Sequence, residues 1–211
     1  MKRKNKFFQN YLIFFLAFSS YSIFTHADSF ENNFYNNHGS VGSINIPTAR
    51  FFDEGVHGIT LYDGTPDSKI TLTSSPYNWM EASFFYTNID GQPYCGLTYD
   101  PVCAQDSKDK GFNIKIRLKK EGRLPAIAVG LNDFAGTGYY NSEYIVSSYG
   151  INNIDFHFGL GWGQLNGNRD LKNPLSYVSD RFLVRPTGFS KSGGAFNPDK
   201  YFSGPKISPF F

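Results

Sequence analysis

Residues 112–119 alternate strictly between apolar and polar side chains. The segment reads Phe-Asn-Ile-Lys-Ile-Arg-Leu-Lys, and on a β-strand such alternation separates the two kinds of side chain onto opposite faces. The apolar face carries Phe112, Ile114, Ile116 and Leu118, and the polar face carries Asn113, Lys115, Arg117 and Lys119. A strand of this kind needs an apolar medium on one side and a polar environment on the other.

The same rhythm recurs along the middle of the chain and predicts about seven strands. They are expected at 57–62, 69–75, 79–88, 111–120, 124–131, 140–149 and 154–163. Turn residues separate them, with a short connection at 121–123 and a long one at 89–110. No helical periodicity is found, so the expected fold is all-β, an antiparallel up-and-down meander.

The last of these segments, 154–163, has an unusually open polar face. Phe156, Phe158, Leu160 and Trp162 fall on one side. Asp155, His157 and three glycines fall on the other. The small residues leave space along that face of the strand.

The alternating region defines the expected organisation of the chain. Residues 28–56 are read as a polar lead-in followed by a loop with a short strand, where Pro47 would interrupt a central strand. Residues 57–163 form the sheet. Residues 164–211 are rich in Asn, Gly, Pro and Ser and show no alternation, so an irregular and truncated tail is expected there.

Residues 1–27 have the pattern of a cleavable signal peptide. Four basic residues, Lys2, Arg3, Lys4 and Lys6, precede an apolar stretch at 11–24, and small residues allow a cut before Asp28. Removing those four charges takes the formal net charge from +2 to −2. Nucleic acid is therefore not an expected partner.

Composition strengthens the case for a membrane-embedded sheet. Aromatic residues make up 18% of the chain, with 22 Phe and 14 Tyr, and charged residues also make up only 18%. Apart from the signal, no segment approaches the roughly 20 apolar residues that a membrane-spanning helix needs, so any crossing would use strands. Single-chain outer-membrane barrels have even strand numbers from about eight. Seven strands therefore indicate part of a barrel, or a shortened form of a longer one.

The two cysteines, Cys95 and Cys103, lie in a stretch that resembles a loop. Outside the cytoplasm a local disulfide is expected, with free thiols as the alternative. None of the four histidines lies nearby, so no metal site is expected. No cofactor is expected either.

The cationic row Lys115, Arg117 and Lys119 is the main candidate for binding. Lining a lumen, it would attract a polyanion such as an anionic extracellular polysaccharide. His157, near Asp155, is a further candidate on the polar lining. The alternative is that all of them are ordinary solvated residues on a soluble sheet.

Catalytic arrangements are weak in this sequence. Asp133 and Glu143 flank a glycine-bearing turn and could serve as a carboxylate pair in a glycosidase. Such proximity arises easily by chance, and the motifs of serine hydrolases, zinc proteases and nucleotide-binding loops are absent. The chain is not expected to be an enzyme.

Several blocks of sequence resemble the YjbH/GfcD family of exopolysaccharide and capsule biosynthesis proteins. The blocks are 42–50, 109–118, 124–138, 156–163 and 173–182, and they occur in the family's order. Their shared residues look structural: Pro47, Arg50, Gly111, Asp133, Gly136, Gly138 and Trp162.

The resemblance implies a large outer-membrane β-barrel that moves or retains an extracellular polysaccharide with the help of periplasmic polysaccharide-secretion lipoproteins. Family members are commonly lipoproteins and several times longer, whereas here no cysteine follows the apolar signal. The chain is therefore expected to be the N-terminal part of such a protein, located in the outer membrane without its own lipid anchor. The alternative is a secreted, soluble β-sandwich that binds carbohydrate or a partner.

Overall fold

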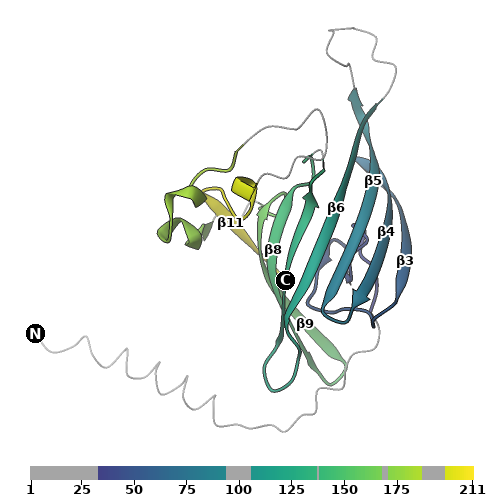
Figure 1. Ribbon diagram of the computed structural model, residues 1–211, viewed down its shortest axis with the longest axis vertical. Coiled ribbons are helices and arrows are strands. Elements are labelled where there is room, and N and C mark those ends of the chain that lie inside the picture. Colours follow the sequence, from purple (N-terminus) through teal and green to yellow (C-terminus); the bar gives the residue numbers. More distant parts are fainter. Residues whose placement is uncertain (1–32, 94–105, 137, 168–170, 187–197) are drawn as a thin grey trace, which may run out of the picture.

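One strongly curved antiparallel sheet dominates the structure. The computed structural model describes residues 33–93, 106–136, 138–167, 171–186 and 198–211. Nine strands lie in the order β10-β11-β9-β8-β7-β6-β5-β4-β3 (Figure 1). The all-β prediction is confirmed. The predicted signal peptide 1–27 and the predicted disulfide between Cys95 and Cys103 lie outside the described residues.

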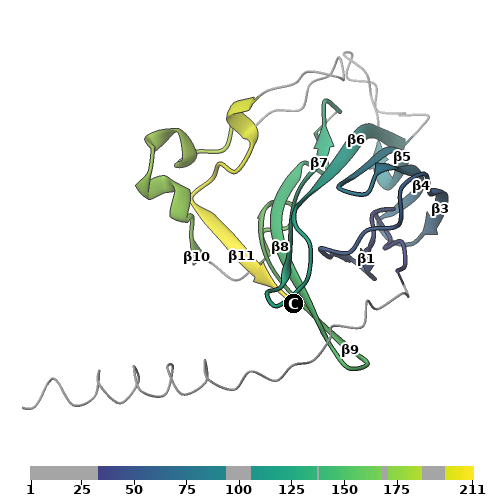
Figure 2. The ribbon, with the colours of Figure 1, turned by 60° about the horizontal axis from the view of Figure 1, so that its bottom comes forward.

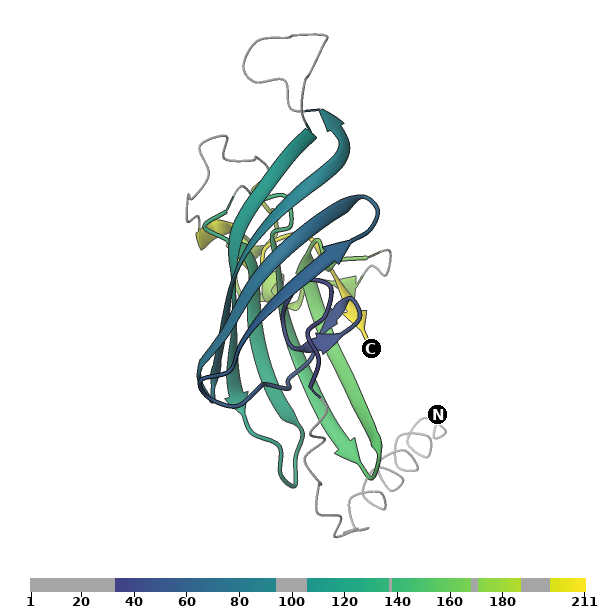
Figure 3. The same cartoon turned by 90° about the vertical axis from the view of Figure 1, so that its right-hand side faces the viewer.

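The seven predicted strands form the body of this sheet as a meander, each pairing antiparallel with the next. They are β3 (His57–Asp63), β4 (Asp67–Tyr77), β5 (Met80–Pro93), β6 (Asp106–Lys119), β7 (Ala126–Phe134), β8 (Ser142–Ile151) and β9 (Ile154–Gly163). Figure 3 shows them side by side and inclined to the long axis of the molecule. β5 and β6 have 14 residues each. Both strands extend several residues into the segment 89–110, the predicted long connection.

The two faces of the sheet have the opposite polarity to that of a water-soluble sheet. On the convex, outer face apolar side chains are exposed, and an exposed row crosses four adjacent strands in register: Ile59, Leu72, Phe84 and Phe112. On the concave, inner face polar side chains are buried, among them Thr71, Glu81, Asp109, Asn113 and Lys115. No second large sheet covers the apolar face within the part of the chain that the structure describes, as a β-sandwich would require.

Residues 33–56 lie against the concave face of the sheet and bury the polar side chains of that face. They contain the two-residue strands β1 (Gly42–Ser43) and β2 (Ile46–Pro47), which pair with each other, and Figure 2 shows β1 inside the curve of the sheet. Pro47 therefore lies in a short strand outside the large sheet, as its missing donor requires. We call residues 33–56 the inner segment.

The region after β9 is ordered and contributes two strands to the sheet. The short β11 (Lys206–Phe210) pairs with β9, and β10 (Leu171–Lys172) pairs with β11. The expectation of an irregular tail is wrong for the residues of β10 and β11. Their sequence does not alternate, and they are strands because β11 pairs with β9 and β10 pairs with β11. The 3₁₀ turns η1 (Pro174–Tyr177), η2 (Asp180–Phe182) and η3 (Pro198–Lys200) lie between them.

Asn173 organises this C-terminal region. It is fully buried, and its side-chain amide donates to the carbonyl oxygens of Phe182, Phe202 and Gly204. The region covers the outer face near the ends of β8 and β9, where Trp162 contacts Phe202 edge to face at 5.1 Å. Trp162 is consequently buried although it belongs to the apolar outer row of β9.

A small apolar core joins the inner segment to the sheet. Its buried members are Ala49, Phe51, Ala126, Ala128, Tyr144 and Val146, with Leu165 and Phe210 packed against them. Gly130 is needed here, since a side chain at this position would meet the ring of Tyr144 at 2.2 Å. No helix among the described residues is long and apolar enough to cross a membrane.

Candidate functional site

Two residues of the predicted cationic row, Lys115 and Arg117, lie on the inner face of the sheet, and the inner segment covers part of it. A register shift after Arg117 pairs Lys119 with Ile127, a residue of the outer face of β7. Lys115 is 1% exposed, whereas Arg117 and Lys119 are partly exposed. The guanidinium of Arg117 lies 4.4 Å from the centre of the Phe51 ring. Alternation thus indicated the correct face for Lys115 and Arg117 but not for Lys119, because it does not reveal the bulge in β6. Lys115 itself faces protein and not an open lumen.

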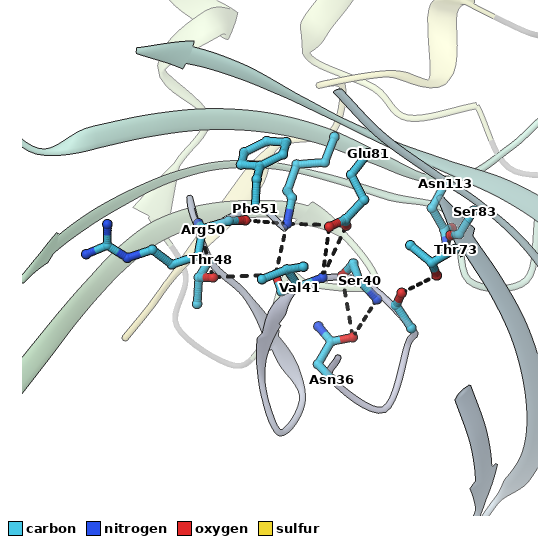
Figure 4. Close-up of polar contacts among 12 residues, drawn as sticks. Asn36, Ser40, Val41, Thr48, Arg50, Phe51, Thr73, Glu81, Ser83 and Asn113 are labelled. Carbon is cyan, nitrogen blue, oxygen red and sulfur yellow. Dashed lines mark hydrogen bonds and ion pairs between the residues drawn. The ribbon is translucent and has the colours of Figure 1, made fainter. Parts of the chain in front are cut away.

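A buried ion pair between Lys115 and Glu81 holds the inner segment in place (Figure 4). The ammonium of Lys115 lies 3.2 Å from a carboxylate oxygen of Glu81 and donates to the carbonyl oxygens of Val41 and Arg50 at 2.9 and 3.0 Å. Glu81 in turn accepts the backbone N–H of Val41 at 3.2 Å. Each charge is therefore matched by an opposite charge and by hydrogen bonds, the condition under which buried ions are tolerated. A glycan contact by Lys115 would require it to leave these partners.

Arg50 makes a second set of contacts between the inner segment and the sheet. Its guanidinium binds both carboxylate oxygens of Asp155 and also Glu121, which accepts the backbone N–H of Gly150. Burial alone would lower the pKa of Arg50, but the hydrogen bonds to Asp155 and Glu121 outweigh it and raise the pKa. The resemblance marked Arg50 as a structural residue, and the structure gives it a connecting position between the β6–β7 turn and β9.

His157 belongs to the same region and contacts Ser148. Its Nδ1 lies 2.9 Å from the hydroxyl of Ser148, and its Nε2 lies 3.6 Å from Asp155. These three residue types suggest a catalytic triad, but Ser148 is 1% exposed and its oxygen accepts the backbone N–H of Ala49. Ser148 therefore has no open position for a substrate, and the group serves to attach the inner segment.

The two carboxylates considered for glycoside hydrolysis have different partners. Glu143 is fully buried and binds Arg185 of the C-terminal region at 2.7 Å. Asp133 accepts the backbone N–H of Tyr140 at 3.0 Å, and its own backbone N–H donates to Asn113. Glu143 thus joins β8 to the C-terminal region, and Asp133 holds the turn that follows β7.

The glycines of the family blocks surround Asp133. A side chain at Gly111 would meet Asp133 Oδ1 at 2.4 Å, and one at Gly136 would clash with the same oxygen and with the backbone of residues 110 and 111. Gly138 has φ +90°, which favours glycine. These residues make the tight bulge at the end of β7, where Asp133 itself has φ +52°.

A cavity of about 230 Å³ lies elsewhere on the inner face. It is lined by His38, Lys69, Phe85, Asn113, Asn132, Tyr140, Ser142, Gln164 and Leu165. Lys69 lies 3.5 Å from Asp67 and 4.3 Å from the centre of the Tyr140 ring. Burial, and then Lys69, lower the pKa of His38 to about 4. Burial, followed by the hydrogen bond to Asp67, raises the pKa of Tyr140.

Sequence reasoning did not single out His38, Lys69 or Asn132 as site residues. A usable signal was present in β4, where Asp67, Lys69, Thr71, Thr73 and Ser75 alternate with residues of the outer face. All five are buried. Among the described residues, no group of three or more His, Cys, Asp or Glu side chains is arranged to hold a metal ion.

Comparisons with known proteins agree with the motif resemblance. The YjbH family model, "Exopolysaccharide biosynthesis protein YbjH", matches residues 34–210. The chain is 34% identical over 168 residues to "Uncharacterized lipoprotein YjbH" of Escherichia coli (strain K12), a match that covers 79% of this chain and 24% of that relative. The chain thus spans about a quarter of the relative's length, and no solved structure matches it. It belongs to the YjbH family of exopolysaccharide biosynthesis proteins.

Proposed function

We propose that the chain forms part of an outer-membrane β-barrel that contacts or guides an extracellular polysaccharide during its production or secretion. Family membership supports the role in exopolysaccharide production. The name of the E. coli relative, a lipoprotein, supports export to the envelope and attachment to a membrane. Periplasmic polysaccharide-secretion lipoproteins are the proposed protein partners, and the remaining part of a longer chain would supply further strands.

The exposed apolar outer face is the observation that carries the membrane part of this proposal. Ile59 is 68% exposed, Leu72 49%, Phe112 46% and Phe158 54%. On each of these strands the neighbouring residues of the opposite face are less exposed. Soluble monomers rarely expose a contiguous apolar surface of this kind, whereas outer-membrane barrels face lipid with an apolar band and carry polar residues inside.

The inner face is the proposed contact surface for the polysaccharide. Arg117 and His157 stay the candidates on this face for contact with an anionic glycan, since Lys115 is occupied by Glu81 and Lys119 pairs with Ile127 of the outer face. The aromatic side chains are distributed over both faces of the sheet. Phe84 and Tyr86 lie exposed on the outer side, Tyr144 is buried in the core, and Tyr140 lines the cavity.

Site-directed spin labelling tests the membrane placement. Nitroxides are attached one at a time at Leu72, Phe112 and Phe158 in the full-length protein in outer-membrane vesicles, after Cys95 and Cys103 are replaced by serine. We expect high accessibility to oxygen, which dissolves in lipid, and low accessibility to a water-soluble nickel chelate. The exposed turn residue Asn153 is the control and should show the reverse. Chelate access at all three outer positions would favour the secreted, soluble alternative.

Deletion of the gene tests the role in the polysaccharide. We expect less extracellular polysaccharide with an unchanged intracellular precursor pool, because the proposed step follows synthesis. Expression of the full-length protein should restore secretion. Unchanged secretion after deletion would contradict the proposed function, whatever the membrane placement.

A further inference from the structure

The cavity on the inner face has the mixed lining that sugar rings require. Phe85, Leu165 and the ring of Tyr140 supply apolar walls, and Lys69, Asn132 and Gln164 supply polar atoms. A pyranose has the same dual character, with C–H groups on its faces and hydroxyls around its rim. Residues from the inner segment, five strands and two loops meet here, so the cavity depends on the whole fold.

Two amide side chains of the lining keep unused hydrogen-bond acceptors. The side-chain N–H of Asn132 donates to Ser142 Oγ at 3.1 Å, and that of Gln164 donates to the carbonyl oxygen of Tyr139 at 3.0 Å. These bonds fix both amides by their nitrogen ends. Across the described ranges of the chain, Asn132 Oδ1 and Gln164 Oε1 accept no hydrogen bond from protein. Two positioned carbonyl oxygens suit a ligand that brings hydroxyl donors.

The charges around the cavity favour an uncharged ligand. Lys69 is the one formally charged residue of the described lining, and Asp67, 3.5 Å away, offsets it. Asp109 and Asp133 also act on Lys69 from nearby. None of the described residues that line the cavity is an arginine, the side chain best suited to bind carboxylates and phosphates in pairs of hydrogen bonds. An acidic sugar would therefore lose its hydration without gaining a full counter-charge.

We infer that this cavity binds one uncharged sugar residue of the polysaccharide that the protein handles. The volume of about 230 Å³ lies below the roughly 300–1,000 Å³ of pockets for drug-sized ligands, so a single ring is the appropriate size. The inference rests on the proposed function and refines it. Acidic sugars of the same polymer would stay outside the cavity, on the inner face where Arg117 is partly exposed.

Binding of two chemically matched sets of fragments tests this inference. Extracellular polysaccharide from the producing cells is cleaved to short oligosaccharides, and half of the sample is treated to reduce its uronic acid carboxyls to primary alcohols. Both sets carry a neutral fluorescent label, and binding to the full chain in detergent micelles is measured by anisotropy. We expect the reduced fragments to bind at least as tightly as the untreated ones.

Point variants locate the binding. Gln164→Ala and Asn132→Ala each remove one acceptor and are expected to weaken binding about three- to tenfold, the usual range for one hydrogen bond. Gln92→Ala, an exposed glutamine at the end of β5 outside the cavity lining, is the matched control and should bind as the parent chain does. Circular dichroism and heat-modifiable migration on gels check that every variant is folded.

Three results would overturn the inference. They are loss of binding after carboxyl reduction, parental binding by both cavity variants, and no binding of either fragment set to the folded parent chain. None of them contradicts the proposed function by itself, because the deletion experiment measures secretion independently of this cavity.

Discussion

The buried pair of Lys115 and Glu81 shows how a single residue can have a role different from the one its sequence pattern indicates. Alternation placed Lys115 on the polar face correctly. It did not reveal what covers that face, because periodicity records only the side on which a residue lies. The partner, the inner segment, is separated from Lys115 by more than 60 residues along the chain.

Substitution of Lys115 tests this structural role. Lys115→Met leaves the carboxylate of Glu81 buried without its counter-charge and removes a donor from two carbonyl oxygens. We expect a loss of about 3–5 kcal/mol in the free energy of unfolding, as for other broken buried pairs. Urea unfolding of the chain in micelles provides the measurement.

Lys119→Met is the matched control for this experiment, since Lys119 belongs to the same row but is partly exposed. We expect its effect to stay within about 0.5 kcal/mol. The double variant Glu81→Gln, Lys115→Met should recover part of the loss, because no buried charge is then left unmatched. Equal effects of the two single lysine variants would show that the ion pair does not hold the inner segment.

His38 predicts a pH dependence of stability. Its pKa is about 4 in the folded protein against 6.5 ordinarily, so between these values the unfolded state binds more protons. Stability is therefore full above about pH 6.5, falls as the pH is lowered and levels off near pH 4. The loss is at most about 3 kcal/mol.

The experiment compares unfolding of the parent chain and His38→Gln between pH 4 and 8. The variant should lack this part of the pH slope, whereas His57→Gln, at an exposed histidine of β3, should keep it. Since Asp67 and Lys69 also lie close to His38, only the difference between the slopes is assigned to His38. Parallel slopes for the parent chain and His38→Gln would contradict the prediction.

At the scale of elements, local pattern predicted the strands that carry it and missed those that depend on distant partners. The seven segments within 57–163 alternate and were all found. By contrast, β11 has only five residues, one of which is Pro209. It is a strand because it pairs with β9, where Gly159 leaves room for the Phe210 ring. A short segment of this kind has no periodicity of its own to detect.

The inner segment is a similar case. Its sequence predicted a loop with a short strand, which the structure contains as β1 and β2. Its position against the concave face follows from bonds to distant residues, such as the hydroxyl of Thr73 donating to the carbonyl oxygen of Gly39. The indication in the sequence was indirect: strands with a buried polar face need hydrogen-bonding partners, and some part of the chain must provide them.

At the scale of the whole molecule, the sheet has the distribution of polarity that the proposed function requires, with lipid outside and sugar inside. Apolar side chains cover the outside, while hydrogen-bonding groups are collected within the curve. Aromatic rings of the outer face pack against one another across neighbouring strands. The ring centres of Phe84 and Phe112 lie 5.4 Å apart, and those of Phe112 and Phe134 lie 6.1 Å apart. Under the proposed membrane placement, the candidate sugar cavity lies on the side away from lipid.

Charged substitutions on the outer face distinguish a membrane sheet from a soluble one. Leu72→Lys and Phe112→Lys place a cation near the middle of β4 and β6, and lysine at the midplane of a bilayer costs about 2–4 kcal/mol. Leu118→Lys, near the end of β6, should cost about 0–1 kcal/mol because it lies close to the interface. Unfolding from phospholipid vesicles measures all three. In a soluble protein these exposed positions should tolerate lysine alike, within about 0.5 kcal/mol. A cost that depends on position along the strand would therefore support lipid contact, and a uniformly small cost would argue for the secreted alternative.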